Sequence, residues 1–329
     1  MTAEITTRVI AAGGNAIAEA AHCLSSGGLV AFPTETVYGL GGDATDGKVV
    51  ARLYAAKGRP SFNPLIAHVA DMAAARELAI FDDAAERLAA AFWPGPLTLV
   101  LNKRDGCPVA DLATAGLDSI AVRVPDHPVA CDLLRAFGKP VVAPSANRSG
   151  HISPTTAAHV LTDLRGRIDL ILDGGPTTVG IESTIVACLD RAMLLRPGGV
   201  SREAIERVLG SPLADAPEGD TQAPLAPGML ASHYAPRSTL RLNAEDVREG
   251  EALLAYGPLP AGANRASCVL NLSPGGDLVE AAANLFSHLR TLDALKASTI
   301  AVMAVPGEGL GEAINDRLSR AAAPKEIKR

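Results

Sequence analysis

The residues best suited to chemistry are cations held in short, rigid segments. Lys57 and Arg59 stand at the predicted end of a helix and enter the segment Lys57–Leu65 (KGRPSFNPL), in which two prolines restrict the backbone. The C-terminal end of a helix attracts cations by itself, which offers a purely structural explanation. Two cations and the amide of Asn63 in so rigid a loop point instead to a preformed anion site.

Two further polar side chains lie inside predicted apolar strands. Arg123 belongs to Ser119–Pro125 (SIAVRVP), where burial is costly unless the guanidinium meets an anion. That anion is either a carboxylate of the protein or one of a ligand. His68 follows the proline-rich loop, and a histidine in such a strand more often belongs to the core than to a site.

Hydroxyl and amide side chains gather at the ends of other predicted strands. Phe32–Leu40 (FPTETVYGL) puts Thr34 and Thr36 on one face if it stays extended; otherwise it is a proline-containing edge strand and turn. Val141–Gly150 (VVAPSANRSG) leads toward a helix N-terminus, a favourable place for phosphate oxygens. A polar side chain beside a strand and a glycine turn recurs in Gly180–Ile185 (GIESTI) and Leu195–Gly199 (LRPGG).

Signatures of several other chemistries are absent. The chain has no Gly-x-x-x-x-Gly-Lys-Ser/Thr phosphate loop, no His-Glu-x-x-His and no Gly-x-Ser-x-Gly elbow. Gly307–Gly311 follows a strand, but Glu312 breaks the dinucleotide-binding pattern, so we predict a turn before a helix. The 5 cysteines are far apart and form no Cys-x-x-Cys pair, which suits a reducing cytoplasm and argues against a disulfide or metal framework.

Alternating strands and helices must position these residues. Through residues 1–210 this alternation predicts an α/β domain. Residues 211–240 hold five of the 23 prolines and no hydrophobic period, so we predict a stiff linker. Residues 241–329 repeat strand–helix–strand, and apolar residues recur at steps of three and four through Leu278–Leu295, which predicts a small Rossmann-like α/β domain.

Composition narrows the class of protein. A net charge of −6 argues against a surface devoted to nucleic acid, and 48% hydrophobic residues exclude global disorder. The sequence has no apolar run of about 18 residues, and its N-terminus lacks the basic start and apolar block of a signal peptide. We therefore expect a cytoplasmic protein without a membrane segment.

Taken together and in this order, PTETVYGLG, KGRPSFNPL with His68, SIAVRVP, APSANRSG, ESTI and LRPGG resemble the YrdC-type threonylcarbamoyl-AMP synthase domain over residues 10–210. The linker with HYAP and the trailing domain resemble the longer, two-domain form of that family over residues 225–329. The resemblance implies a twisted, mostly open mixed α/β sheet around a large, positively charged cavity. It also implies condensation of L-threonine, bicarbonate and ATP to L-threonylcarbamoyl-AMP and pyrophosphate, for later transfer by partner enzymes to adenosine in tRNA.

The resemblance also implies roles for individual residues. Binding of L-threonine falls to Thr36, His68, Arg123, Ala143 and Ser183, with Arg123 on the carboxylate. Binding of ATP falls to Arg59, Asn63, Ser119, Ser145, Ser153, Arg196 and Tyr234. Lys57 and Asn147 complete the phosphate end, so the expected catalytic set is Lys57, Arg59, Ser145 and Asn147. Mg²⁺ is expected to accompany ATP, with no metal site of the protein's own. No covalent nucleophile stands out, so we expect catalysis by alignment of a carbamate with the α-phosphorus.

The sequence leaves other functions to compare with this one. A non-catalytic protein of the same fold that binds double-stranded RNA or tRNA is the main alternative, although 3% aromatic residues provide no stacking platform. Direct contact with tRNA or with the downstream transferase machinery stays open. A carbamoyltransferase with a related domain would carry zinc-finger-like cysteine clusters and an acylphosphatase segment, which this sequence lacks. The broken glycine motif disfavours a dehydrogenase.

Pro227–Pro236 carries bulky side chains in an otherwise bland linker. Because the carbamate and the mixed anhydride both break down in water, we predict that this segment is a lid that brings Tyr234 against ATP. The alternative is a segment that packs on the first domain only to fix the domain orientation.

Overall fold

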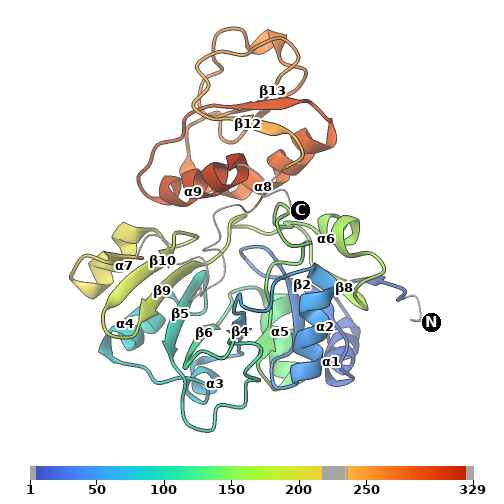
Figure 1. The fold of residues 1–329 in the computed structure, drawn as a ribbon, viewed down its shortest axis with the longest axis vertical. Coiled ribbons are helices and arrows are strands. Elements are labelled where there is room, and N and C mark those ends of the chain that lie inside the picture. The colour runs from blue at the N-terminus through green and yellow to red at the C-terminus, as the bar shows by residue number, and fades with distance from the viewer. Residues whose placement is uncertain (1–4, 217–233, 235, 324–329) are drawn as a thin grey trace.

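The computed structural model describes residues 5–216, 234 and 236–323, which form two α/β domains (Figure 1). The larger, N-terminal domain is built on a mixed sheet with the strand order β1-β8-β2-β3-β7-β4-β6-β5-β9-β10-β11. In chain order its strands are β1 (Arg8–Ala11), β2 (Val30–Pro33), β3 (Tyr38–Asp43), β4 (Ile66–His68), β5 (Leu97–Asn102), β6 (Ser119–Arg123), β7 (Val141–Val142), β8 (Leu170–Asp173), β9 (Thr184–Cys188), β10 (Ala192–Arg196) and β11 (Ala214–Asp215).

Helices cover this sheet and pack on one another. The first and fifth helices pack together against β2 and β8, the second packs on β3, and the fourth packs on the seventh. Their bounds are α1 (Ala16–Ser25), α2 (Gly47–Lys57), α3 (Met72–Arg76), α4 (Asp83–Phe92), α5 (Pro128–Phe137), α6 (Ala157–Leu164) and α7 (Arg202–Leu209). The mixed sheet with helices agrees with the α/β class expected from the alternation of elements.

Local signals end α2 at the place where the expected site begins. The Asp46 carboxylate accepts from the backbone N–H groups of Lys48 and Val49, which caps the start of the helix. Gly58 ends it with φ of 61°, a left-handed conformation that glycine adopts without steric cost. Lys57 is therefore the last helical residue, and Arg59 starts the proline-rich loop.

Strand register brings two predicted site residues together. β4 and β6 are parallel neighbours in which His68 pairs with Arg123. β7 lies antiparallel on the other side of β4 and pairs Val141 with His68. β7 then runs antiparallel to β4 and away from His68, so the loop that follows it starts beside Ile66, whose carbonyl accepts from Ala143 N–H.

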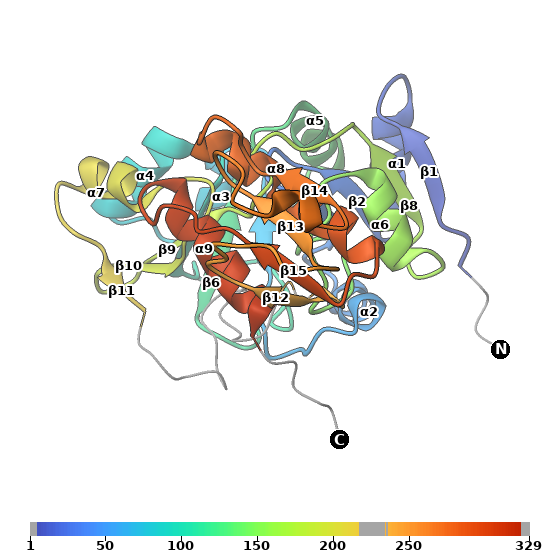
Figure 2. The ribbon, with the colours of Figure 1, turned by 90° about the horizontal axis from the view of Figure 1, so that it is seen from above.

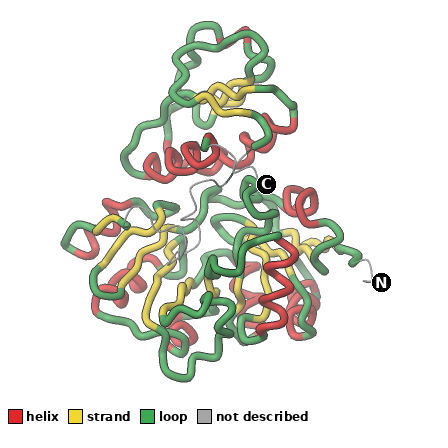
Figure 3. Tube along the Cα trace, viewed as in Figure 1, coloured by secondary structure: helices red, strands yellow, loops and turns green. Residues whose placement is uncertain are grey.

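The C-terminal domain has a parallel sheet with the order β12-β15-β13-β14. Two helices form the layer between this sheet and the N-terminal domain, as Figure 3 shows, and Figure 2 shows the domain lying over the middle of the larger one. Its elements are β12 (Thr239–Arg241), β13 (Ala252–Ala255), a 3₁₀ turn (Ala263–Arg265), β14 (Val269–Asn271), α8 (Leu278–Ala294), β15 (Thr299–Val302) and α9 (Leu310–Ala322). Gly307–Gly311 is the expected turn, because α9 begins within it.

Both ends of the predicted linker belong to sheets. β11 pairs with β10, and β12 pairs with β15 and starts before residue 240. A strand of two or three residues has no hydrophobic period of its own, so the sequence does not reveal it. Most of Pro227–Pro236, the segment predicted to be a lid, lies outside the described residues.

Other elements were absent from the sequence prediction: β1, β3, β10, α3 and α4. The glycine-rich sequence of β3 (YGLGGD) is typical of a turn. It forms a strand here, and the sheet needs a small residue at Gly41. A Cβ added there would lie 2.8 Å from the Phe32 ring and 3.1 Å from Val141. Within the described ranges no helix is long and apolar enough to cross a membrane.

Candidate active site

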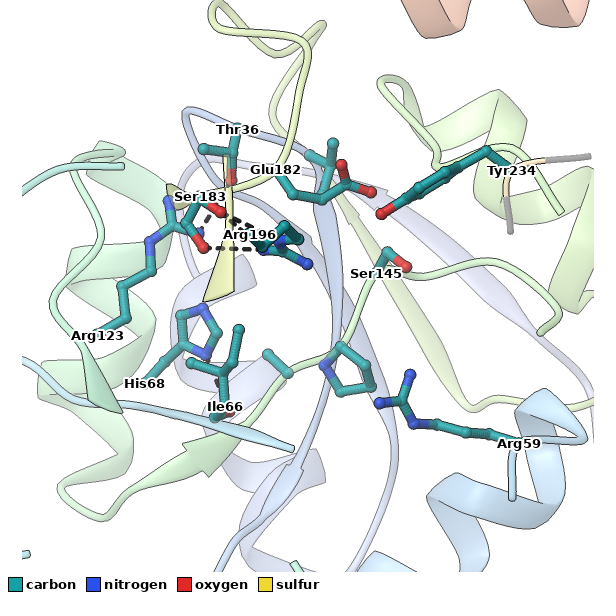
Figure 4. Close-up of a pocket in the computed structure, with 13 residues that line it drawn as sticks. Thr36, Arg59, Ile66, His68, Arg123, Ser145, Glu182, Ser183, Arg196 and Tyr234 are labelled. Carbon is teal, nitrogen blue, oxygen red and sulfur yellow. Dashed lines mark hydrogen bonds between the residues drawn. The ribbon is translucent and has the colours of Figure 1, made fainter. Parts of the chain in front are cut away.

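A cavity of about 50 Å³ lies where several loops of the N-terminal sheet meet, as Figure 4 shows. Arginine and hydroxyl side chains dominate its polar wall. The lining residues are Thr36, Val37, Arg59, Ile66, His68, Arg123, Ala143, Pro144, Ser145, Glu182, Ser183, Arg196 and Tyr234. The fold therefore gathers nine of the predicted residues: Thr36, Arg59, His68, Arg123, Ala143, Ser145, Ser183, Arg196 and Tyr234.

Arg123 meets a carboxylate of the protein and still lines the cavity. Its Nη2 donates to Glu35 Oε1 at 2.5 Å, and both side chains are buried. Its Nη1 donates to Thr36 Oγ1 at 3.0 Å, and its Nε donates to Gly95 O at 3.2 Å. Of the two anions considered for Arg123, the structure contains the protein carboxylate. Three of the five guanidinium N–H groups are engaged in these contacts, which leaves two for a ligand.

The segment with Thr34 and Thr36 is a turn and does not stay extended. Thr34 Oγ1 donates to Val37 O at 2.7 Å, so in its 2.8 Å contact with Thr36 Oγ1 it acts as the acceptor. Of the two alternatives for this segment the structure contains the strand and turn, because the chain reverses between β2 and β3, which pair antiparallel. The turn still holds both hydroxyls together and orients Thr36 toward Arg123.

His68 is buried against the cavity as a neutral imidazole. Burial, together with the nearby Arg123, lowers the pKa of His68 to about 3. Its Nδ1 lies 3.3 Å from Ile66 O, and a carbonyl only accepts, so this nitrogen carries the hydrogen. The other ring nitrogen is thereby left as an acceptor. His68 thus contributes a polar, uncharged surface at neutral pH.

Arg196 and Arg59 approach the cavity from two other loops. Arg196 Nη2 donates to Ser183 O at 2.8 Å and to Ser183 Oγ at 3.2 Å. Arg59 Nη2 donates to Pro64 O at 3.0 Å, and burial followed by the field of Arg196 lowers the pKa of Arg59 to about 10. Both remain cations at neutral pH. With Arg123, they bring three guanidinium groups to one small cavity.

Lys57 does not line the cavity but contacts the backbone of a loop that does. Its side chain is buried, and Nζ donates to Ser145 O at 2.5 Å and to Asn147 O at 2.6 Å. Burial and then Arg59 lower its pKa well below the ordinary value. Lys57 ends α2, as the sequence predicted, and its buried side chain packs against the backbone of the loop after β7. It fixes the backbone that carries Ser145.

Five predicted residues do not form the cavity wall: Lys57, Asn63, Ser119, Asn147 and Ser153. Ser119 starts β6 while Arg123 ends it, which separates them by about 13 Å at ~3.3 Å per residue. The buried amide oxygens of Asn63 and Asn147 have no hydrogen-bond partner in the part of the chain that the structure describes. Such oxygens are costly to bury, and a bound ligand or water would satisfy them.

Sequence reasoning did not assign Glu182, although it belongs to the quoted ESTI motif. Its Oε1 accepts from Ser153 Oγ at 2.5 Å, and its Oε2 accepts from Arg317 Nε at 2.8 Å. Burial by itself raises the pKa of Glu182, but Arg317, Arg196 and these hydrogen bonds lower it to about 2. Glu182 is thus a fixed carboxylate in a cationic cavity. Its position next to Ser183, a predicted site residue, was the feature of the sequence that could have identified it.

Tyr234 reaches the cavity from the C-terminal side of the linker. It is buried, and its ring stacks on Phe286 of α8 with 5.4 Å between ring centroids. Burial is the main cause that raises the pKa of its hydroxyl to about 12. The hydroxyl therefore stays protonated. As a residue of the predicted lid, Tyr234 is in contact with both the cavity and the C-terminal domain.

No group of three or more histidine, cysteine, aspartate or glutamate side chains within the described ranges could hold a metal ion. All five cysteines lie in these ranges and are unpaired. The polar groups that converge are guanidinium, hydroxyl, one imidazole and one carboxylate. This set suits the binding of anionic oxygens and of an amino acid.

Comparison with known proteins gives matches to both domains. A family model described as "Telomere recombination" matches residues 22–198, and one described as "Threonylcarbamoyl-AMP synthase, C-terminal domain" matches residues 200–323. A threonylcarbamoyl-AMP synthase of Bacillus subtilis is 42% identical over 327 residues, 95% of this chain and 94% of that protein. One of Schizosaccharomyces pombe is 37% identical, over 89% and 85%. The crystal structure of P. abyssi Sua5 complexed with L-threonine superposes with a TM-score of 0.87 at 38% identity, over 96% of this chain and 97% of that one.

Proposed function

The chain belongs to the threonylcarbamoyl-AMP synthase family, and from this premise we propose that its cavity condenses L-threonine, bicarbonate and ATP into L-threonylcarbamoyl-AMP and pyrophosphate. The observation that carries the proposal is the meeting of Arg59, Arg123 and Arg196 with hydroxyl groups in one buried cavity. The reactants are a polyphosphate, a carbonate and an amino-acid carboxylate. Their charges need several cations close together, in a place from which water can be excluded.

The threonine subsite lies around Thr36, His68, Arg123, Ala143 and Ser183. The two unused N–H groups of Arg123 suit a carboxylate, and Glu35 keeps the guanidinium in place. Ser183 Oγ contacts Thr98 Oγ1 at 2.7 Å and thereby offers a hydroxyl held in one orientation. A relative from P. abyssi was crystallised with L-threonine, which supports a threonine site in this fold.

The ATP subsite lies around Arg59, Ser145, Arg196 and Tyr234, with Asn63, Ser119, Ser153, Lys57 and Asn147 behind or beyond the wall. Arg59 and Arg196 neutralise phosphate charge, and Lys57 holds the backbone of the loop that carries Ser145. Mg²⁺ belongs to this proposal as the companion that ATP brings with it. The carboxylate of Glu182 already accepts from two partners and is poorly suited to bind a metal ion.

The reaction needs alignment more than a protein nucleophile. The threonine amine takes up bicarbonate with loss of water and forms a carbamate. A carbamate oxygen then attacks the α-phosphorus, and pyrophosphate leaves as the new P–O bond forms. The arginines hold both anions at bonding distance, which converts an encounter of repelling groups into a reaction within one complex. Neutral His68 adds no charge that would compete for the carboxylate.

The product serves downstream enzymes that transfer the threonylcarbamoyl group to adenosine in tRNA, and we place the reaction in the cytoplasm as part of the same proposal. The unpaired cysteines suit a reducing compartment. No observation favours RNA binding over synthesis, so it stays an outcome of the test.

The test is mass detection of threonylcarbamoyl-AMP from purified protein with L-threonine, bicarbonate and MgATP. Pyrophosphate release is measured in parallel, with each substrate omitted in turn. We expect both products only when all three substrates are present. Pyrophosphate release at the same rate with and without threonine would contradict the proposal. Tight RNA binding without formation of threonylcarbamoyl-AMP would also contradict it.

A further inference from the structure

One side chain of the C-terminal domain contacts residues that form the N-terminal site. Arg317 on α9 is fully buried; its Nε donates to Glu182 Oε2 at 2.8 Å and its Nη2 to Pro197 O at 2.9 Å. Glu182 belongs to the ESTI motif and Pro197 to LRPGG, so one guanidinium joins two segments of the cavity. Its Nη1 pairs with Asp316 at 2.6 Å.

The contact continues from Glu182 into the predicted ATP subsite. Glu182 Oε1 accepts from Ser153 Oγ, and the guanidinium of Arg317 lies 5.3 Å from the centroid of the Tyr234 ring. Figure 4 shows the carboxylate of Glu182 and the hydroxyl of Tyr234 directed toward each other across the cavity. Arg317 does not line the cavity, but it contacts two residues that do.

The loop with Ser153 is also held by α8. Arg290 donates to the carbonyls of Ile152 and Ser153 and pairs with Asp163 of α6 at 2.9 Å. Both helices of the C-terminal domain thus act on Ser153, α8 by a direct contact with its carbonyl and α9 through Glu182, which accepts from its hydroxyl. Such polar contacts, one of them from a fully buried arginine, do more than attach the domain.

Arg317 neutralises the carboxylate of Glu182 in a site that is proposed to bind anions. A buried carboxylate without its partner would repel a triphosphate and is costly to leave unpaired. Burial alone would lower the pKa of Arg317, but Tyr234, Glu182 and Asp316 raise it above the ordinary value. The pair therefore stays charged and locked, with Ser153 Oγ held in one direction.

We propose that Arg317 is a positioning residue of the synthase reaction: through Glu182 it orients Ser153 and the wall beside Tyr234, so that the C-terminal domain completes the ATP subsite. The inference rests on the proposed function for its substrate. A merely structural contact is available for comparison, because Arg202 of α7 pairs with Glu312 of α9 at 2.7 Å at the part-exposed domain boundary.

The experiment compares Arg317→Met, Glu182→Gln, their double variant and the control Arg202→Met. We expect Arg317→Met to weaken ATP binding, measured by calorimetry, at least tenfold and to raise KM for ATP in step, with KM for threonine within twofold of wild type. Arg202→Met keeps both values within twofold. In the Glu182→Gln background, Arg317→Met should change ATP affinity less than threefold, because no unpaired carboxylate is left.

Two results would overturn the inference: ATP affinity in Arg317→Met equal to that in Arg202→Met, or effects of Arg317→Met and Glu182→Gln that multiply in the double variant. If Arg317→Met does not fold, Arg317→Lys replaces it; an ATP affinity at least threefold below wild type supports the inference, and wild-type affinity overturns it. Calorimetry needs no turnover. A wild-type protein that binds ATP but makes no threonylcarbamoyl-AMP would refute the proposed function while the test of Arg317 stands.

Discussion

Lys57 offers a direct test of how the site is supported. Its ammonium donates to the carbonyls of Ser145 and Asn147, and the residue has a relative exposure of only 3%. Lys57→Met keeps most of the aliphatic stem and removes both donors. The two carbonyls lie in the loop after β7, which carries three residues of the cavity wall, Ala143, Pro144 and Ser145. The substitution therefore acts on stability and on ATP binding together.

The magnitude follows from the two lost hydrogen bonds. Asn147 O is left without a donor, at a cost of about 1–3 kcal/mol, whereas Ser145 O keeps the N–H of Asn147 and loses one charge-assisted bond, worth about 1.5–3 kcal/mol. The free energy of unfolding should therefore fall by about 2.5–6 kcal/mol. A shift of the loop by ~1 Å in a site that works by alignment can reduce the rate roughly a hundredfold. We expect both effects in the same variant.

Urea unfolding and the steady-state rate of threonylcarbamoyl-AMP formation provide the two measurements. Lys48→Met is the matched control, because Lys48 is exposed in the first turn of the same helix. It should change stability by less than about 0.5 kcal/mol and leave the rate unchanged. A Lys57→Met protein as stable as this control would show that Lys57 does not support the loop. Loss of activity at full stability would instead place its ammonium directly on phosphate.

Three other predictions concern the wall of the cavity. Arg59→Met should lower the rate of adenylate formation about a hundredfold, the typical effect of losing one charged donor to a developing charge; a wild-type rate would remove Arg59 from the mechanism. Valine should react at least tenfold more slowly than threonine in kcat/KM, with serine between them, because Thr36, Arg123 and Ser183 present polar groups to the substrate; equal rates would contradict this threonine subsite. The pKa of His68 is lowered to about 3 in the folded protein from an ordinary value of 6.5, so the unfolded chain binds more protons between these values and acid favours unfolding. The free energy of unfolding should therefore fall as the pH drops from 6.5 to about 4.5, by up to ~1.4 kcal/mol per pH unit. Urea unfolding at a series of pH values should show that this free energy depends less on pH in His68→Gln than in the wild-type protein.

The sequence by itself predicted the long helices and most of the residues that line the cavity. Asp46 and Gly58 set the ends of α2, and the apolar period from residue 278 onward predicted α8, because caps and periodicity depend on neighbours within a few turns. The motifs also predicted Lys57, Arg59, Arg123 and Arg196 as the cations of an anion site, and the structure brings the three arginines to one cavity. The predicted function followed from the resemblance of these motifs, in this order, to the synthase family.

Only the tertiary structure decided which charges meet. Arg123 and Glu35 are 88 positions apart, and Arg317 and Glu182 are 135 apart, so no local pattern connects them. Sheet order and the docking of α9 bring each pair together, and burial then makes the pairing obligatory because an unpaired charge is costly there. For the same reason the sequence does not show that Lys57, at the end of α2, is buried and donates to the carbonyls of Ser145 and Asn147. Side-chain partners over such separations depend on register and packing, which the order of residues alone does not specify.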